Sequence, residues 1–283
     1  MDHATANATG AVTWWQLNQL AVWEVVLVGA ATGLIGALAL MHRRIFFAEA
    51  VSHAAFPGAV LGVVAGAALA PGRITELIFA GALIGCLVLA GVMAVLVRLP
   101  GISSQAAAGI VLSSGFGLGY FAATWFAPLP VRVESFLTGS VLTANAVDVA
   151  AAGVVLALAV VAWWGVGPRL VSLGFSEALF RASIGTHRLY DALVLVLVCL
   201  GIVVAIPAVG TIVSIALIAA PPAILRPWVR TPGALLAGSP LVGIAIGLVG
   251  LASAQWWGLS AGGMIALWSG VIYAASVGGR QLT

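Results

Sequence analysis

The chain is built from apolar runs of about twenty residues that carry almost no charge. A helix rises about 1.5 Å per residue, so such a run crosses the ~30 Å hydrocarbon layer of a bilayer. Only 7% of the 283 residues are charged, whereas a soluble domain carries about 25%, and the mean hydropathy is +1.19. Transmembrane β-strands would alternate apolar and polar residues in segments of about ten. The sequence therefore predicts an all-α integral membrane protein and excludes a water-soluble fold.

Turn signals between the apolar runs indicate nine membrane spans. They cover residues 21–41, 50–70, 76–97, 105–127, 146–165, 190–206, 210–225, 235–254 and 260–278. The sixth and seventh are short, and only the segment Pro207 to Gly210 separates them. Breaks at membrane depth are tolerated where protein or a water-filled cavity satisfies the freed backbone, so eight spans plus a re-entrant or broken pair is the alternative. We expect residues 1–20 to form an extracytoplasmic tail and residues 21–280 to form one membrane domain.

All eleven basic residues are arginines, and lysine is absent. The phosphate-binding loop of ATPases and Schiff-base cofactors both require a lysine, so neither chemistry resides in this chain. Nine arginines fall in the connections after spans one, three, five and seven or at the C-terminus. The positive-inside rule then places the N-terminus outside and the C-terminus in the cytoplasm. No basic patch resembles a nucleic-acid surface, so we expect membrane lipid around the chain and no nucleic acid partner.

Two ionisable residues, Glu49 and His53, lie where the first connection turns into the second span. Ionisable groups inside a membrane are costly and mark functional sites by default. In a helix the spacing of four places both side chains on one face, one turn apart. Carboxylate oxygen and imidazole nitrogen both bind divalent transition metals. One copy supplies two ligands and two facing copies supply four; a hydrogen-bonded pair that only fixes helix packing is the alternative.

The longest cytoplasmic connection contains a short amphipathic pattern from Phe175 to Gly185. Ser176 is a plausible N-cap and Gly185 a plausible stop, so the pattern predicts a helix of about two turns. Its apolar positions recur at intervals of three and four. A helix of this kind suits either the membrane interface or a groove on a partner protein.

The segment from Arg43 to Gly58 (RRIFFAEAVSHAAFPG) resembles the signature of bacterial zinc/manganese/iron ABC importer permeases. Three later segments resemble further blocks of that family in the same order. They are Phe175 to Gly185, similar to the coupling helix, Val209 to Pro221, and Gly258 to Gly263. The resemblance covers most of residues 20–278 and implies the metal-importer-type permease fold with eight to nine transmembrane helices.

The resemblance also implies partners and roles. In this family two permease copies form the pore, two cytoplasmic ATP-binding subunits drive it, and an extracytoplasmic protein delivers the metal. The metal ligands fall on Glu49 and His53, with Zn²⁺ or Mn²⁺, and iron as a third candidate, as transported substrate and no permanently bound cofactor. Glu49 stands where the family has aspartate. The surface that docks onto the ATPase would comprise Phe175, Ser176, Glu177, Ala178, Leu179, Arg181 and Gly185, although Ser176 and Phe180 depart from the family pattern.

The leading hypothesis is therefore the permease subunit of an ATP-driven metal importer in the bacterial inner membrane, not an enzyme in itself. An ABC permease for a metal chelate, such as a siderophore or cobalamin, would need a wide cavity instead of a small Glu/His site. A secondary transporter that uses Glu49 for proton coupling would work without an ATPase and leaves the 175–185 helix unexplained. A membrane enzyme would need clustered catalytic groups, and only Glu49 and His53 lie near each other in the sequence.

Overall fold

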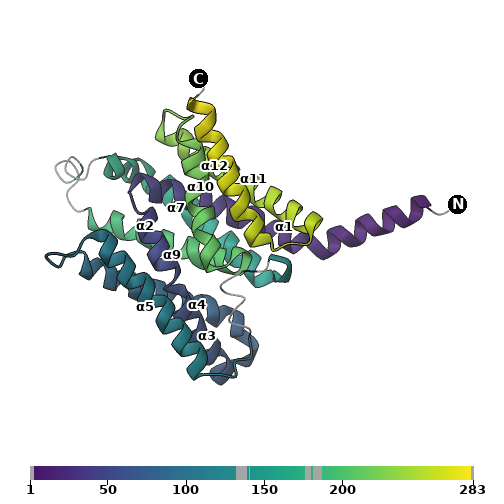
Figure 1. The fold of residues 1–283 in the computed structure, drawn as a ribbon, viewed down its shortest axis with the longest axis horizontal. Helices are drawn as coiled ribbons and strands as arrows, with labels where there is room; N and C mark the ends of the chain where they lie inside the picture. The colour runs from purple at the N-terminus through teal and green to yellow at the C-terminus, as the bar shows by residue number, and fades with distance from the viewer. Residues whose placement is uncertain (1–2, 132–138, 140, 176–179, 181–186, 282–283) are drawn as a thin grey trace.

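The computed structural model describes residues 3–131, 139, 141–175, 180 and 187–281. These residues form a helical bundle (Figure 1). In chain order the elements are α1 (His3–Met41), α2 (Ile45–Ser52), α3 (Ala55–Leu69), the 3₁₀ turn η1 (Pro71–Arg73), α4 (Ile74–Leu96), α5 (Ser104–Trp125), the 3₁₀ turn η2 (Val141–Thr143), α7 (Ala146–Phe175), α9 (Arg188–Val209), α10 (Thr211–Leu225), α11 (Pro232–Trp257) and α12 (Ala261–Gln281). Strands are absent from the described residues, which confirms the predicted all-α class.

Eight segments of the described chain are long and apolar enough to cross a membrane. They match eight of the nine predicted spans within a few residues, apart from α1 and α7, which extend further. The one predicted span left over is the seventh, 210–225, which is the shorter helix α10. Arg226, directly after α10, lines the same cavity as Arg43, which lies two residues after the end of α1. The short helix therefore returns the chain to the end of the bundle where α1 ends.

Helix α1 begins at His3 and includes most of the segment that the sequence indicated as a tail. No proline occurs in residues 1–41, so no residue of this stretch blocks the helix. Figure 1 shows its N-terminal half projecting from the bundle, while the half that follows Asn18 enters it.

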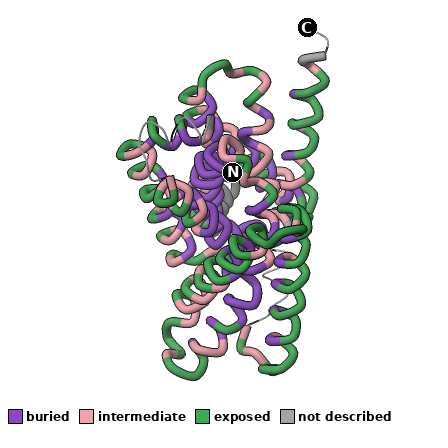
Figure 2. Tube along the Cα trace, turned by 90° about the vertical axis from the view of Figure 1, so that its left-hand side faces the viewer, coloured by how far each residue is buried: buried purple, intermediate pink, exposed green. Residues whose placement is uncertain are grey.

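The second half of α1 lies at the centre of the bundle and is packed closely by glycines. A Cβ at Gly29 would lie 2.7 Å from the carbonyl oxygen of Gly243 in α11. A Cβ at Gly36 would overlap the carbonyl oxygen of Ile218 in α10. Small residues let helix backbones approach closely in membranes, where van der Waals contacts drive association. The buried residues accordingly gather toward the middle of the bundle (Figure 2).

The second predicted span is two helices, not one. Helix α2 ends at Ser52 and α3 begins at Ala55, with a turn at His53 and Ala54. Helices α3 and α4 then run side by side, because Gly58 and Gly81 each leave no room for a Cβ against the other's backbone. This break places His53 at a helix end instead of mid-helix.

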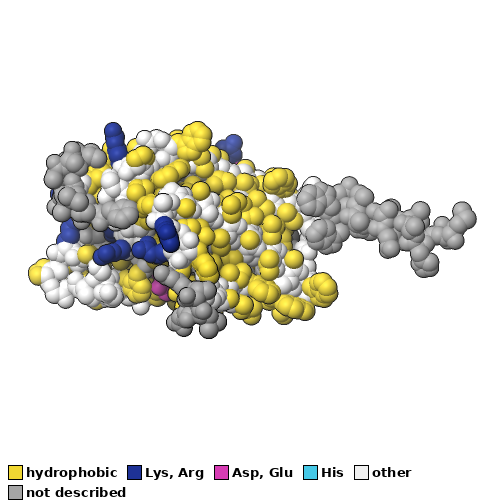
Figure 3. All heavy atoms as spheres, turned by 90° about the horizontal axis from the view of Figure 1, so that it is seen from above, with side chains coloured by type: hydrophobic (Ala, Val, Ile, Leu, Met, Phe, Trp, Pro, Cys, Tyr) yellow, Lys and Arg dark blue, Asp and Glu magenta, His cyan; other side chains and the backbone are white. Residues whose placement is uncertain are grey.

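The hydrophobic side chains cover the body of the molecule between its two ends (Figure 3). Most of the arginines visible in that view lie toward the end away from the N-terminal segment. This distribution is typical of a multi-pass membrane protein with one arginine-rich side.

Candidate metal site

Glu49 and His53 are the two accessible positions in an otherwise buried stretch of chain. Every residue from Phe47 to Val60 is buried except these two, which are half-buried. His53 keeps helical backbone angles (φ −71°, ψ −20°) although it caps α2, so it lies one turn beyond Glu49. The carboxylate and the imidazole are close enough to interact electrostatically. The structure thus brings together the two residues that the spacing predicts to share a face.

Helices α4 and α5 hold the turn that carries His53. In α5, a Cβ at Gly115 would lie 3.1 Å from the carbonyl oxygen of His53. In α4, a Cβ at Gly85 would lie 2.7 Å from the carbonyl oxygen of Ala54. The Cys86 thiol, also in α4, donates to the carbonyl oxygen of Val51 at 3.6 Å. These contacts fix the backbone at the break, where two helices leave unpaired polar groups.

One nitrogen of the His53 imidazole is buried and unpaired. Its Nδ1 is shielded from solvent and has no hydrogen-bond partner. The ring meets Phe116 of α5 edge-on, with 6.3 Å between centroids, which orients the imidazole. An unpaired buried polar atom is costly, so a group that binds this nitrogen would remove the cost.

One copy of the chain does not close a metal site by itself. Among the described residues, no group of three or more His, Cys, Asp or Glu side chains is arranged to hold a metal ion. Glu49 and His53 supply one oxygen and one nitrogen, and transition metals take four to six ligands in proteins. A metal ion held by Glu49 and His53 would therefore need further ligands from outside the described side chains, such as a second copy, water or backbone.

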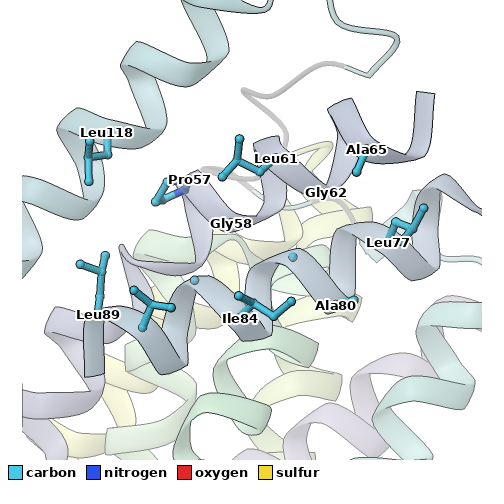
Figure 4. Close-up of a pocket in the computed structure, with 13 residues that line it drawn as sticks. Pro57, Gly58, Leu61, Gly62, Ala65, Leu77, Ala80, Ile84, Leu89 and Leu118 are labelled. Atoms are coloured by element: carbon cyan, nitrogen blue, oxygen red, sulfur yellow. The ribbon is translucent and has the colours of Figure 1, made fainter. Parts of the chain in front are cut away.

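An apolar groove of about 430 Å³ lies beyond His53, between α3, α4 and α5. Figure 4 shows Pro57, Leu61 and Ile84 along its two main walls, with Leu118 contributed by α5. Its lining contains no charged residue. The groove therefore offers no ligand for a bare cation, and Glu49 and His53 remain the polar groups on this side of α2.

An ion pair anchors the start of α2. Both carboxylate oxygens of Asp191 in α9 accept from the Arg44 guanidinium, at 2.7 and 2.8 Å. Arg44 is the residue that precedes α2, so the pair ties the helix that carries Glu49 to α9. Beside it, burial lowers the pKa of His42, and Arg44 lowers it further, against opposing effects of Asp191 and the Leu170 carbonyl.

The predicted ATPase-docking segment lies almost wholly outside the described residues. Phe175 is the last residue of α7. The structure does not describe Ser176, Glu177, Ala178, Leu179, Arg181 and Gly185, nor does it describe residues 182–184 and 186. Phe180 is described and is buried against Tyr190 of α9, with ring centroids 5.4 Å apart.

Sequence reasoning missed Gly115, Phe116 and the Arg44–Asp191 pair. The signal for the first was present, since Gly115 and Gly119 lie four residues apart within one apolar span, and small residues at that spacing mark helix contacts in membranes. Nothing in the sequence joins Arg44 to Asp191, because they lie 147 residues apart.

Comparison with known proteins places the chain among transport proteins. Residues 15–279 match the model of the ABC 3 transport family. The zinc transport system membrane protein TroC of Treponema pallidum is 30% identical, covering 88% of this chain and 84% of TroC. The manganese import system permease protein ScaB of Streptococcus gordonii is 24% identical, covering 91% and 89%. The structure of PsaBC from Streptococcus pneumoniae in complex with Fab shares the fold, with a TM-score of 0.84, 24% identity and coverage of 96% and 95%.

Proposed function

The chain belongs to the ABC 3 transport family, and from this premise we propose that it imports zinc or manganese, with iron as a third candidate, as the permease subunit of an ATP-driven transporter. The accessibility of Glu49 and His53 in a buried stretch carries the proposal. The two relatives named above are described as zinc and manganese transport proteins. The ion is substrate, and the proposal includes no resident cofactor.

The transported metal ion would bind between two copies of the chain. Each copy contributes one carboxylate and one imidazole, so a two-fold pair supplies two oxygen and two nitrogen ligands. Such a set suits Zn²⁺ and Mn²⁺. Binding requires an ionised Glu49 and a neutral His53, so protons compete with the metal. Phe116 would keep the imidazole oriented as the ion arrives and leaves.

Energy and delivery would come from other chains. The sequence has no lysine, so the ATP-binding loop must lie in a cytoplasmic partner, which would dock onto the segment 175–185. An extracytoplasmic metal-binding protein would deliver the ion at the opposite side. The arginine distribution supports this orientation in the inner membrane, with the N-terminus outside and the C-terminus in the cytoplasm.

The observations favour a bare ion over the alternatives. A metal chelate needs a wide cavity, whereas Glu49 and His53 are two half-buried positions in an otherwise buried stretch. Proton-coupled secondary transport uses no ATPase, whereas membership of an ABC family implies one.

Metal uptake tests the proposal. Cells that lack their own importer would express this chain with its ATP-binding and metal-binding partners, and accumulation of zinc and manganese would be measured. We expect His53→Ala and Glu49→Gln to abolish uptake while His187→Ala, a histidine outside the site, preserves it. Undiminished uptake by both site variants at equal protein levels would refute the assigned pathway.

A further inference from the structure

A cavity of about 560 Å³ opens at the arginine-rich end of the bundle, separate from Glu49 and His53. Three arginines from two connections line it. Arg43 comes from the turn between α1 and α2, and Arg226 and Arg230 come from the connection between α10 and α11. Residues almost 190 positions apart in the sequence thus place their positive charges around one space.

These three charges have no counter-charge in the described chain. None of the residues that line the cavity is acidic. The one ion pair found among described residues joins Asp191 to Arg44, the neighbour of Arg43. All three cavity arginines are exposed. Like charges held together repel one another, so the arrangement favours an anion between them.

The backbone conformation of Arg43 indicates that the turn at this cavity is held in place by its surroundings. Its φ of 55° lies in the left-handed region, and it is the one non-glycine residue of the described chain with positive φ. Such conformations are costly for a residue with a side chain and persist where the surroundings impose them. The strained residue at this turn is also one of the three that line the cavity.

The cavity lies at the level where membrane helices end. Leu40 and Met41 end the first membrane span, and Leu235 lies in the first turn of α11. Trp228 in the adjoining connection is 57% exposed, and its indole N–H donates to Ser276 at 2.7 Å. Tryptophans with one solvent-exposed edge are typical of the lipid headgroup region. The walls thus combine basic and apolar surface at the boundary of the bilayer.

We infer that this cavity binds the phosphate of an anionic phospholipid in the cytoplasmic leaflet. The assignment of the leaflet rests on the proposed orientation. Guanidinium groups bind phosphate oxygens through paired N–H donors, and basic pockets between membrane helices recognise anionic headgroups. Leu40, Met41 and Val229, which line the cavity and are partly exposed, would contact the glycerol and the first carbons of the acyl chains. An acidic segment of a protein partner would make no use of that apolar wall.

Native mass spectrometry of the detergent-solubilised full chain tests this inference, with phosphatidylglycerol and phosphatidylcholine as probes. We expect tighter binding of phosphatidylglycerol by the wild type. The double variant Arg226→Gln/Arg230→Gln should lose about fivefold in affinity for each arginine removed. Arg98→Gln, an exposed arginine outside the cavity, is the matched control and should bind as the wild type does. Arg226→Lys keeps the charge and should retain most of the binding.

Three results would overturn the inference. The first is equal affinity for the two lipids. The second is unchanged phosphatidylglycerol binding by the double variant. The third is displacement of the lipid by glycerol 3-phosphate at similar concentration, which would assign the cavity to a soluble phosphate ester. The measurement needs neither metal nor ATPase, so its failure is distinct from failure of the proposed transport function.

Discussion

Glu49 stands where the resemblance to metal-importer permeases implies an aspartate, and its side chain is one methylene longer than that of aspartate. The longer side chain starts one turn before His53, at a half-buried position of α2. A carboxylate that reaches further can bind an ion at a different distance from the imidazole. If Glu49 binds the ion as proposed, the geometry of the ligand set would contribute to which metal is held.

Shortening this side chain tests that idea. We expect Glu49→Asp to keep metal uptake but to change the ratio of zinc to manganese transported, because the ligand oxygens retreat toward α2. Glu49→Gln removes the charge and should reduce uptake of both metals by at least tenfold, since neutral amides bind these ions weakly. Competition between the two metals in an uptake assay measures the ratio. An identical ratio in the wild type and Glu49→Asp would show that this carboxylate does not set selectivity.

His42 makes folding stability depend on pH. Burial lowers its pKa in the folded chain, whereas an exposed histidine in the unfolded chain has a pKa near ~6.5. Below that pH the unfolded state takes up a proton that the folded state resists, so stability falls as the pH falls and is fully present above ~6.5. We expect the unfolding temperature in detergent to drop between neutral pH and pH ~5.

The variant His42→Gln isolates this contribution. It cannot titrate, so the drop in unfolding temperature over the same range should be smaller than in the wild type. A variant curve parallel to that of the wild type would assign the pH dependence to other groups.

At the scale of elements, close helix contacts depend on glycines, which we expect to be sensitive to a single added methyl group. Gly29→Ala would place a Cβ against the Gly243 carbonyl in α11. Overpacking of this kind costs about 1–3 kcal/mol. We expect a lower unfolding temperature for Gly29→Ala, measured by thermal unfolding in detergent.

Gly91→Ala is the matched control for that substitution, because a Cβ at Gly91 in α4 meets nothing within 4 Å. It should unfold at or above the wild-type temperature, since alanine has the higher helix propensity. An equal decrease in unfolding temperature in the two variants would show that the methyl group added at Gly29 does not act through the contact with α11.

The helices were largely predictable from the sequence, and the break between α2 and α3 was not. Long apolar runs identify spans because a bilayer imposes their length. The same runs hide a two-residue turn at His53 and Ala54, since neither residue is a strong helix breaker and the first proline comes at Pro57. The break depends on contacts from Gly115 and Gly85, in other helices. Glu49 and His53 were predictable as a pair because they are local, whereas the Arg44–Asp191 ion pair depends on tertiary folding.

At the scale of the whole molecule, orientation follows from the arginines and can be measured by cysteine labelling. The two native cysteines, Cys86 and Cys199, are both buried and give little background. Gly72→Cys, in the connection before α4, should react with an impermeant maleimide in intact cells. Arg98→Cys, in the next connection, should react only after permeabilisation. The reverse pattern would invert the proposed topology and move the arginine-lined cavity to the outer leaflet.

Elemental analysis of the purified protein shows whether Glu49 and His53 of two copies bind the transported ion. Protein exposed to zinc or manganese and freed of excess metal would be compared with His53→Ala and with His187→Ala as the control. We expect about one metal ion per two chains, with this metal content retained in His187→Ala and lost in His53→Ala. Equal metal content in all three proteins would contradict it, because the ion would then be bound elsewhere.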